Sequence, residues 1–472
     1  MKQYKKRILS YIMVFLLLLC PLACYCDNIQ AATTQDVSAT PEPTNNIGFP
    51  AITSTSCVIM DADTGQILYA KNPHERQYPA SITKILTAYL AIKNGDLNST
   101  ITMSDAAVWG IDRSSSHIAL DVGEQISMSD ALYAVMLVSA NEAAWAIAEQ
   151  VSGSLDVFVQ LMNDTAASLG CQDTHFTNAN GLHDTNHYTS AYDMALITRE
   201  ALTSNTFCNY ASETYHEIAP TNMNSETRYL IQGNKMMLED SGYYYSACKG
   251  GKTGYTEDAG GTLVVWAEKN DMRIICVTMG APNNSVNYED SILLFDYVFD
   301  NYSSFTPLSD FEFNAEDATR AQNFLNEYYD CENLGTMKLS VDTTQRVVIE
   351  KKASPEDFQI NFEPSADRLD EGYIGTLNIT CLNPAYMNTA SSFVVSLPVS
   401  YSGYVNSKDD AAVRQAYEKG EIRSALLTEK KSTKKIVVAV ILILATIGLF
   451  VYANVFEPRR HMDINDQANR RR

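Results

Sequence analysis

Three short polar segments that lie far apart in the chain impose the strongest constraint on its fold. They are Ser81-Ile82-Thr83-Lys84, Ser139-Ala140-Asn141 and Lys252-Thr253-Gly254. Between them they contain hydroxyl groups, amines and a carboxamide, the groups that serine acyl transfer requires within reach of one another. The sequence therefore predicts an enzyme whose fold brings three distant parts of the chain into one site.

The first segment lies in a predicted helix. Pro79 precedes a run of mostly good helix formers that extends to Ala91, so we expect the helix to begin near Ser81. Residues three apart share a helix face, which lets the Ser81 hydroxyl and the Lys84 amine touch. A lysine acts as a base only when burial or a second cation, here Lys252, lowers its pKa. Serine and lysine also occur at this spacing by chance, so the catalytic interpretation depends largely on the other two segments.

The second segment lies between two apolar helical stretches, Ala131 to Val138 and Ala143 to Ala148. Such a position caps or joins helices, and it can direct side chains into a cleft. In a cleft, Ser139 would relay a proton to the leaving amine, and Asn141 would hold both a substrate amide and the Lys84 amine. An ordinary helix cap is the simpler alternative.

The third segment lies in a glycine-rich stretch, residues 250–256, just ahead of the strand-like run Gly261 to Trp266. Glycines on an edge strand let the backbone of a substrate approach closely. The alternative is a glycine-rich loop with a solvated lysine, and K-T-G by itself is weak evidence. The three segments in this order are far more specific than any one of them.

Together the segments resemble the motifs of the serine D-alanyl-D-alanine carboxypeptidases, the low-molecular-mass penicillin-binding proteins of peptidase family S11. Asn180-Gly181-Leu182-His183 and the run Tyr188 to Ala195 are similar to the stretch that this family carries between its second and third motifs. The resemblance covers residues 52 to 305. It implies an α/β (α+β) transpeptidase-like fold, in which an antiparallel sheet is flanked by a helical subdomain.

The resemblance also implies a role for each motif residue. The implied catalytic residues are Ser81 as the acylated nucleophile, Lys84 as its general base, and Ser139 as a proton shuttle. The implied substrate-binding residues are Asn141, Lys252, Thr253, Gly254, Tyr255 and Thr256. The backbone amides of Ser81 and Tyr255 would form the oxyanion hole.

Recognition of the substrate carboxylate would fall to Lys252, Thr253 and Thr256. Carboxylate recognition would depend heavily on these three residues, because residues 285–288 lack the arginine that relatives place near this group. No C-x-x-C pair or histidine cluster suggests a metal, and we expect no cofactor.

Both ends of the chain predict an exported protein anchored in the cell membrane. Basic residues followed by the apolar run Ile8 to Leu19 are typical of a signal peptide, placed at residues 1–31. Cys24 would permit lipidation, but Pro21 fits that signal poorly. The apolar run 436–453 is long enough for a transmembrane helix, with a buried core helix as the alternative. Export would make the catalytic domain extracellular and the basic tail cytoplasmic.

The remaining organisation follows from local composition. Apolar and polar residues alternate in several runs after residue 306, which predicts a small antiparallel β domain with a spacer or docking role. The expected parts are a linker at 32–50, a catalytic domain at 51–305, a β-rich domain at 306–405, a stalk at 406–435, a transmembrane helix at 436–453 and a tail at 454–472. The net charge of -21 argues against nucleic acid as a partner.

The expected activity is removal of the terminal D-alanine from peptidoglycan stem peptides, with covalent binding of β-lactam antibiotics at the same serine. A β-lactamase is one alternative, although no E-x-x-L-N segment between Asn141 and Lys252 would place the carboxylate that class A enzymes use. Endopeptidase action on cross-links and a β-lactam sensor that never turns over are the others.

Overall fold

Apolar segments near both ends of the catalytic part form one antiparallel sheet in the computed structural model, which describes residues 48–328, 336–352, 354–382 and 393–404. Its strands are β1 (Ser56–Asp61), β2 (Ile67–Lys71), β7 (Cys248–Thr256), β8 (Gly260–Lys269) and β9 (Met272–Ala281). Their order is β2-β1-β9-β8-β7, so the N-terminal hairpin pairs with the C-terminal strands. Strand β7, which carries Lys252, is at an edge.

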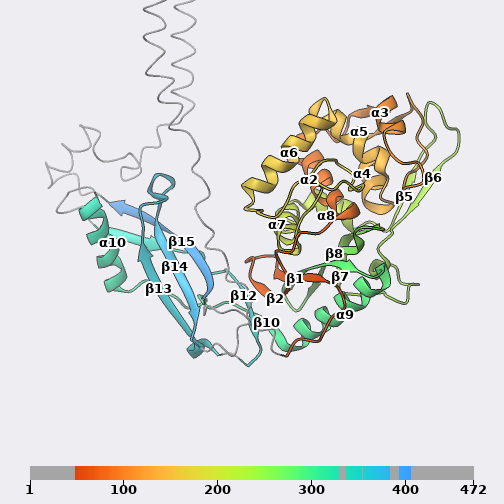
Figure 1. Cartoon of the computed structure of the whole chain (residues 1–472). Helices are drawn as coiled ribbons and strands as arrows, with labels where there is room; N and C mark the ends of the chain where they lie inside the picture. The colour runs from red at the N-terminus through yellow and green to blue at the C-terminus, as the bar shows by residue number, and fades with distance from the viewer. Residues whose placement is uncertain (1–47, 329–335, 353, 383–392, 405–472) are drawn as a thin grey trace, which may run out of the picture. The chain divides into compact units, whose positions relative to one another are not determined.

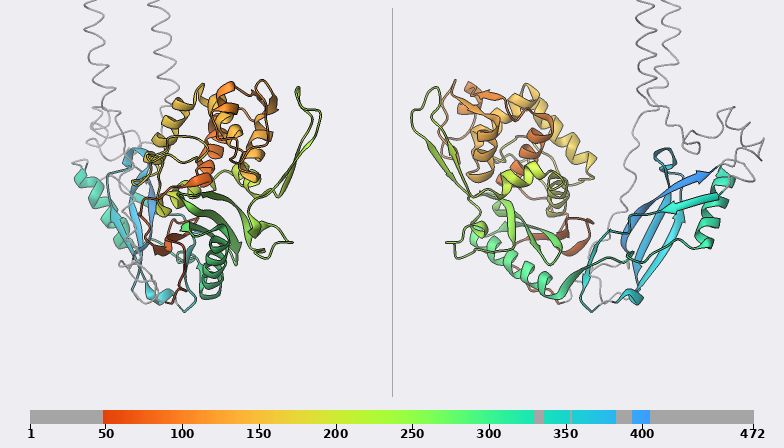
Figure 2. Two further views of the ribbon diagram at one scale, coloured as in Figure 1. Left: turned by 45° about the vertical axis from the view of Figure 1, so that its right-hand side comes forward. Right: turned by 180° about the vertical axis from the view of Figure 1, so that it is seen from behind.

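Both faces of the sheet are buried, each by its own hydrophobic core. Successive side chains of a strand point to opposite faces, so strands such as β1 contribute to both cores. Val58 and Met60 of β1 belong to the core that the sheet shares with the helical layer. Cys57 and Ile59 belong to a second core, formed with helix α9 (Asn284–Asn301). Figures 1 and 2 show α9 on one side of the sheet and helices α2 to α8 on the opposite side.

The helical subdomain that the resemblance implied is formed by the middle of the catalytic part. Its helices are η2 (Ala80–Thr83), α2 (Lys84–Asn94), α3 (Asp105–Trp109), α4 (Met128–Leu137), α5 (Asn141–Ser152), α6 (Leu155–Ser168), α7 (Ala191–Ala201) and α8 (Asn205–Ser212). The short turn η3 (Lys235–Met237) instead contributes Met236 to the core on the α9 side of the sheet. Two small hairpins accompany the helical subdomain, β3 (Thr100–Thr102) with β4 (Gln125–Ser127) and β5 (Tyr215–Ile218) with β6 (Arg228–Ile231). The second hairpin extends away from the helices (Figure 2).

The described chain divides into two compact units. The first contains the described residues up to Ser309 together with the segment Thr344–Gln359 and a second short segment that begins at Ile379. It therefore includes the pair formed by β10 (Tyr302–Phe305) and β12 (Val347–Glu350), and also η4 (Pro355–Asp357).

The second unit is built around a four-stranded sheet of order β11-β15-β14-β13. These strands are β11 (Thr336–Ser340), β13 (Phe358–Pro364), β14 (Tyr373–Cys381) and β15 (Phe393–Tyr404), with η5 (Leu369–Glu371) before β14. Helix α10 (Ala315–Tyr328), which alternation of apolar residues did not predict, lies beside the sheet (Figure 1). Arg320 of this helix donates a hydrogen bond to the Phe362 carbonyl, 2.7 Å away.

The expected signal peptide, linker, stalk, transmembrane helix and tail lie almost wholly outside the described residues. Among the helices of the described part, none has the length and apolar character that crossing a membrane requires.

Candidate active site

The turn before helix α2 presents the predicted nucleophile. Ser81 lies in the 3-10 turn η2, and Lys84 is the first residue of α2, so the α-helix begins three residues later than the sequence predicts. Residues i and i+3 eclipse each other in a 3-10 turn, which favours contact between the two side chains. Ala80, just before the serine, has a φ of 50°, a left-handed conformation that is uncommon for a residue with a side chain. Such strain is characteristic of functional sites.

The Lys84 amine makes three polar contacts. Its Nζ atom lies 3.0 Å from Ser81 Oγ and 2.7 Å from Asn141 Oδ1, and it also bonds to the backbone carbonyl of Asn180. The last two groups can only accept hydrogen bonds, so they take the two N–H donors of a neutral amine. The lone pair of that amine is left for the Ser81 hydroxyl, which is the arrangement that a general base needs.

The protonation state of Lys84 follows from its surroundings. The side chain is fully buried, and burial holds its pKa well below the ordinary value for lysine. The Lys252 ammonium lowers the pKa further, whereas the buried carboxylate of Glu142 acts in the opposite direction. The two lowering effects favour the neutral amine, so Lys84 is suited to remove a proton from Ser81.

The second motif joins two helices, as predicted. Helix α4 ends at Leu137 and α5 begins at Asn141, whose side-chain Nδ2 donates to Ser115 Oγ at 2.8 Å. This contact orients the carboxamide so that its oxygen faces Lys84. Ser139 has a φ of 64°, and its buried hydroxyl has no hydrogen-bond partner within the described part of the chain. A strained residue with an unpaired buried hydroxyl fits a site that substrate completes.

The third motif passes directly beside the nucleophile. A Cβ atom placed on Gly254 would lie 2.7 Å from the Ser81 backbone nitrogen. Strand β7 therefore approaches the turn so closely that only a glycine fits at this position. Lys252 is buried, and its Nζ donates to the Thr253 carbonyl at 2.9 Å. Burial lowers the pKa of Lys252 to about 7. A bound carboxylate would favour its ammonium form.

The remaining predicted residues are placed less closely around Ser81. Tyr255 is 54% exposed, so its side chain takes little part in the buried network, although its backbone lies on the same strand. The Thr256 hydroxyl accepts a hydrogen bond from the Ala259 amide within the β7–β8 turn, at 3.0 Å. Asn287, from the stretch that lacks the expected arginine, is buried beneath the sheet and accepts a hydrogen bond from Thr278 Oγ1.

Sequence reasoning did not identify Asn180 or Ser115, which complete the polar contacts of Lys84 and Asn141. Asn180 contributes a backbone carbonyl, a group that every residue carries. A weak signal was present in the neighbouring Gly181, whose φ of 82° and contact with the Ala80 carbonyl exclude a side chain. No group of His, Cys, Asp and Glu side chains among the described residues could hold a metal ion.

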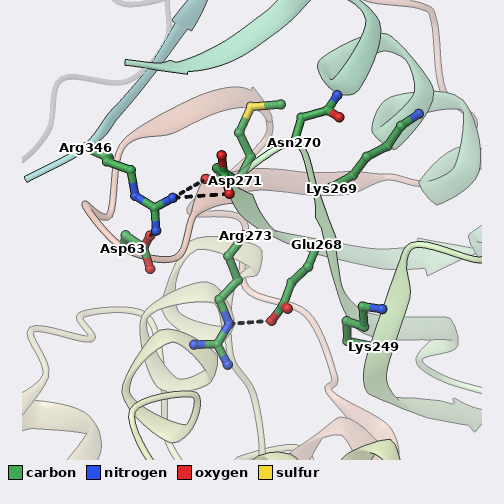
Figure 3. A pocket seen from close by; sticks show the side chains of 9 residues that line it. Asp63, Lys249, Glu268, Lys269, Asn270, Asp271, Arg273 and Arg346 are labelled. Atoms are coloured by element: carbon green, nitrogen blue, oxygen red, sulfur yellow. Dashed lines mark hydrogen bonds and ion pairs between the residues drawn. The ribbon is translucent and has the colours of Figure 1, made fainter. Parts of the chain in front are cut away.

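One surface pocket lies away from these residues, beside the β8–β9 turn. Its volume is about 520 Å³, and its lining contains none of the motif residues (Figure 3). Five of its charged side chains form ion pairs: Arg273 lies 3.2 Å from Glu268, and Arg346 lies 3.8 Å from Asp63 and 3.9 Å from Asp271. The pocket therefore lies outside the site that the three motifs form.

A family model for D-alanyl-D-alanine carboxypeptidase, Peptidase_S11, matches residues 41–283, more than half of the chain. The chain belongs to this family. It is 36% identical over 270 residues to the D-alanyl-D-alanine carboxypeptidase DacA of Haemophilus influenzae, and 34% identical over 252 residues to DacF of Bacillus subtilis. These matches cover 55% and 53% of this chain but only 65% and 63% of the relatives.

Two solved structures share the fold of this chain over much of their length. Penicillin-binding protein 5 from Haemophilus influenzae matches with a TM-score of 0.58 and 26% identity, over 75% of this chain and 97% of that one. The Streptomyces K15 DD-transpeptidase matches with a TM-score of 0.51 and 25% identity, over 54% of this chain and all of that one. The comparisons thus establish the penicillin-binding protein fold that the motifs predicted.

Proposed function

We propose that this S11 family member is a serine D-alanyl-D-alanine carboxypeptidase that removes the terminal D-alanine from peptidoglycan stem pentapeptides. The observation that carries the proposal is the buried Lys84 amine, whose two carbonyl partners leave its lone pair directed to the Ser81 hydroxyl. The names of the relatives support the same reaction. The Streptomyces neighbour is named a transpeptidase, so the choice of acyl acceptor is the point that an experiment must test.

The geometry suggests how each residue acts in the reaction. Lys84 removes the Ser81 proton as the hydroxyl attacks the carbonyl between the two D-alanines. The backbone amides of Ser81 and Tyr255 stabilise the oxyanion, a kind of contact whose removal typically costs ~3–4 kcal/mol. The Ser139 hydroxyl passes the proton to the departing amine of D-alanine. Water then hydrolyses the ester, with Lys84 again acting as the base.

Substrate binding uses the groups on either side of the serine. The Lys252 ammonium and the Thr253 hydroxyl bind the terminal carboxylate, and Asn141 accepts from a substrate amide while it holds Lys84. A β-lactam offers a cyclic amide and a carboxylate in a comparable arrangement. It therefore acylates Ser81 by the same steps, and the enzyme binds penicillin covalently.

We also propose that the enzyme is anchored in the cell membrane by residues 436–453, with the catalytic unit outside and the tail at 454–472 inside. This part of the proposal rests on the uncharged apolar run and the basic residues on both sides of it. Protease added to wall-free cells should degrade the catalytic unit and spare a tag placed after Arg472. Loss of the tag would contradict this topology.

The activity is tested by incubating the purified protein with a pentapeptide ending in D-Ala-D-Ala. Free D-alanine should appear with the wild type and not with Ser81→Ala, which also should not be labelled by a fluorescent penicillin. An added amine acceptor distinguishes transpeptidation, and a cross-linked dimer distinguishes endopeptidase action. Rapid turnover of penicillin without release of D-alanine would instead indicate a β-lactamase, and stable labelling without release would indicate a sensor.

A further inference from the structure

A buried histidine lies behind the turn that carries Ser81. His187 is 2% exposed, and its ring bridges the segment that follows Phe176 and the first residues of the nucleophile's helix. Its Nδ1 atom lies 3.0 Å from the backbone nitrogen of Thr177, and its Nε2 atom lies 2.9 Å from Thr83 Oγ1. No step of the proposed mechanism uses this ring.

The hydrogen-bond partners define the state of the ring. A backbone N–H can only donate, so Nδ1 must accept from Thr177 and therefore carries no proton. Burial lowers the pKa of His187 to about 3 and outweighs the opposing effect of the Asp184 carboxylate, so the ring is neutral at physiological pH. The single ring proton is then on Nε2, where it is donated to Thr83 Oγ1.

This donation determines what Thr83 does with its own proton. Because its oxygen accepts from His187, its hydroxyl is directed to the other group within reach, the Ala80 carbonyl at 2.8 Å. That carbonyl belongs to the residue whose φ is 50°, immediately before the nucleophile. Gly181 packs against the same carbonyl, since a Cβ there would lie 1.9 Å from the Ala80 oxygen and 3.0 Å from Thr83 Oγ1.

We infer that His187 is a positioning residue for acylation, which acts through Thr83 to hold the strained Ala80 turn and so to place the Ser81 hydroxyl and backbone N–H. This inference rests on the proposed acyl transfer at Ser81. Without the Nε2 proton, Thr83 is free to rotate and the Ala80 carbonyl loses its fixed donor. The turn then relaxes and moves the nucleophile relative to the amide of Tyr255.

The consequence is specific to one kinetic step. Residues Lys252 and Thr253, which bind the carboxylate, lie on β7 and have no hydrogen bond with His187 in the described structure. Loss of this relay, the pair of hydrogen bonds from His187 to Thr83 and from Thr83 to the Ala80 carbonyl, should therefore slow the chemical step of acylation and leave initial binding unchanged. Misplacement of reacting groups by about 1 Å can cost on the order of a hundredfold in rate.

The test measures acylation of the full-length protein by a fluorescent penicillin in stopped flow, which separates the acylation rate constant from the dissociation constant of the first complex. His187→Phe removes both ring nitrogens, and Thr83→Val removes the relay hydroxyl. Each should lower the rate constant by at least about tenfold with the dissociation constant unchanged. The double variant should lose no more than the worse single variant, because both changes remove one relay.

Conservative variants separate positioning from folding. His187→Gln keeps an N–H at the position of Nε2 and should retain the rate within about threefold while its Tm falls. Thr83→Ser should behave similarly. Thr198→Val is the matched control, since Thr198 is a buried threonine that donates to the Met194 carbonyl in α7, away from the nucleophile turn. It should lower Tm without changing the acylation rate constant.

Several outcomes would overturn the inference: a wild-type rate constant in His187→Phe or in Thr83→Val, multiplicative losses in the double variant, or a change confined to initial binding. If His187→Phe does not fold, Thr83→Val and His187→Gln still decide the question. Absence of acylation in the wild type would instead refute the proposed function itself.

Discussion

Replacement of Gly254 by alanine should slow acylation strongly with little effect on the fold. The added Cβ would lie 2.7 Å from the Ser81 backbone nitrogen, 2.4 Å from Thr262 Oγ1 and 3.1 Å from the Ala80 side chain. The first two separations are too short for any carbon atom. Strand β7 and the nucleophile turn must therefore move apart by several tenths of an ångström.

The size of the effect follows from which groups move. The separation displaces the Ser81 N–H from the Tyr255 N–H, and the proposed oxyanion hole needs both. Loss of one such donor typically costs ~10²–10³ in rate. Overpacking of a tight contact costs ~1–3 kcal/mol of stability. We therefore expect acylation to slow at least about a hundredfold, with only a moderate fall in Tm.

The assay is the second-order rate of labelling by a fluorescent penicillin, measured well below the Tm of each variant. Gly242→Ala is the control, because a Cβ at Gly242 would meet no heavy atom within 4 Å and the backbone there does not require glycine. It should label at the wild-type rate. Labelling of Gly254→Ala within twofold of wild type would show that the approach of β7 to Ser81 does not form the oxyanion hole.

Three further outcomes are expected. Lys84→Ala should slow acylation by several orders of magnitude, because no other base contacts Ser81 in the described structure; normal acylation of a folded variant would place the base elsewhere. The value of kcat/KM should fall on acidification, because Lys84 takes up a proton and can no longer act as the base. It should also fall above about pH 7, because burial lowers the pKa of Lys252 to about 7 and this side chain then loses its charge. A pH profile without a fall on the alkaline side would contradict the role given to Lys252. Lys252→Gln should reduce kcat/KM for a free carboxylate peptide by more than a hundredfold, beyond the ~1.5–3 kcal/mol of one charge-assisted contact, and harm a C-terminally amidated peptide less. Equal losses would leave carboxylate recognition to Thr253 or Thr256.

The sequence was sufficient wherever the signal is local or depends on side-chain identity. The spacing of Ser81 and Lys84 predicted their contact, and the apolar stretches around Ser139 predicted the junction between α4 and α5. Alternation of apolar and polar residues after residue 306 indicated strands such as β13 and β14, because the side-chain period of a strand is two. The same alternation missed helix α10, whose few buried residues, Ala321 and Leu325 among them, form too narrow an apolar stripe.

Tertiary structure alone decided the parts of the site that depend on burial and backbone direction. The Asn180 carbonyl reaches Lys84 across 96 residues of sequence, and any residue could supply that group. The lowered pKa of Lys84 depends on the whole core that removes water from its amine. The left-handed Ala80 and the buried His187 have no signature in their own neighbourhoods, because contacts with distant segments maintain them. The sequence thus determined which chemical groups the chain carries. Packing decided which of these groups form hydrogen bonds with one another and which of them are protonated.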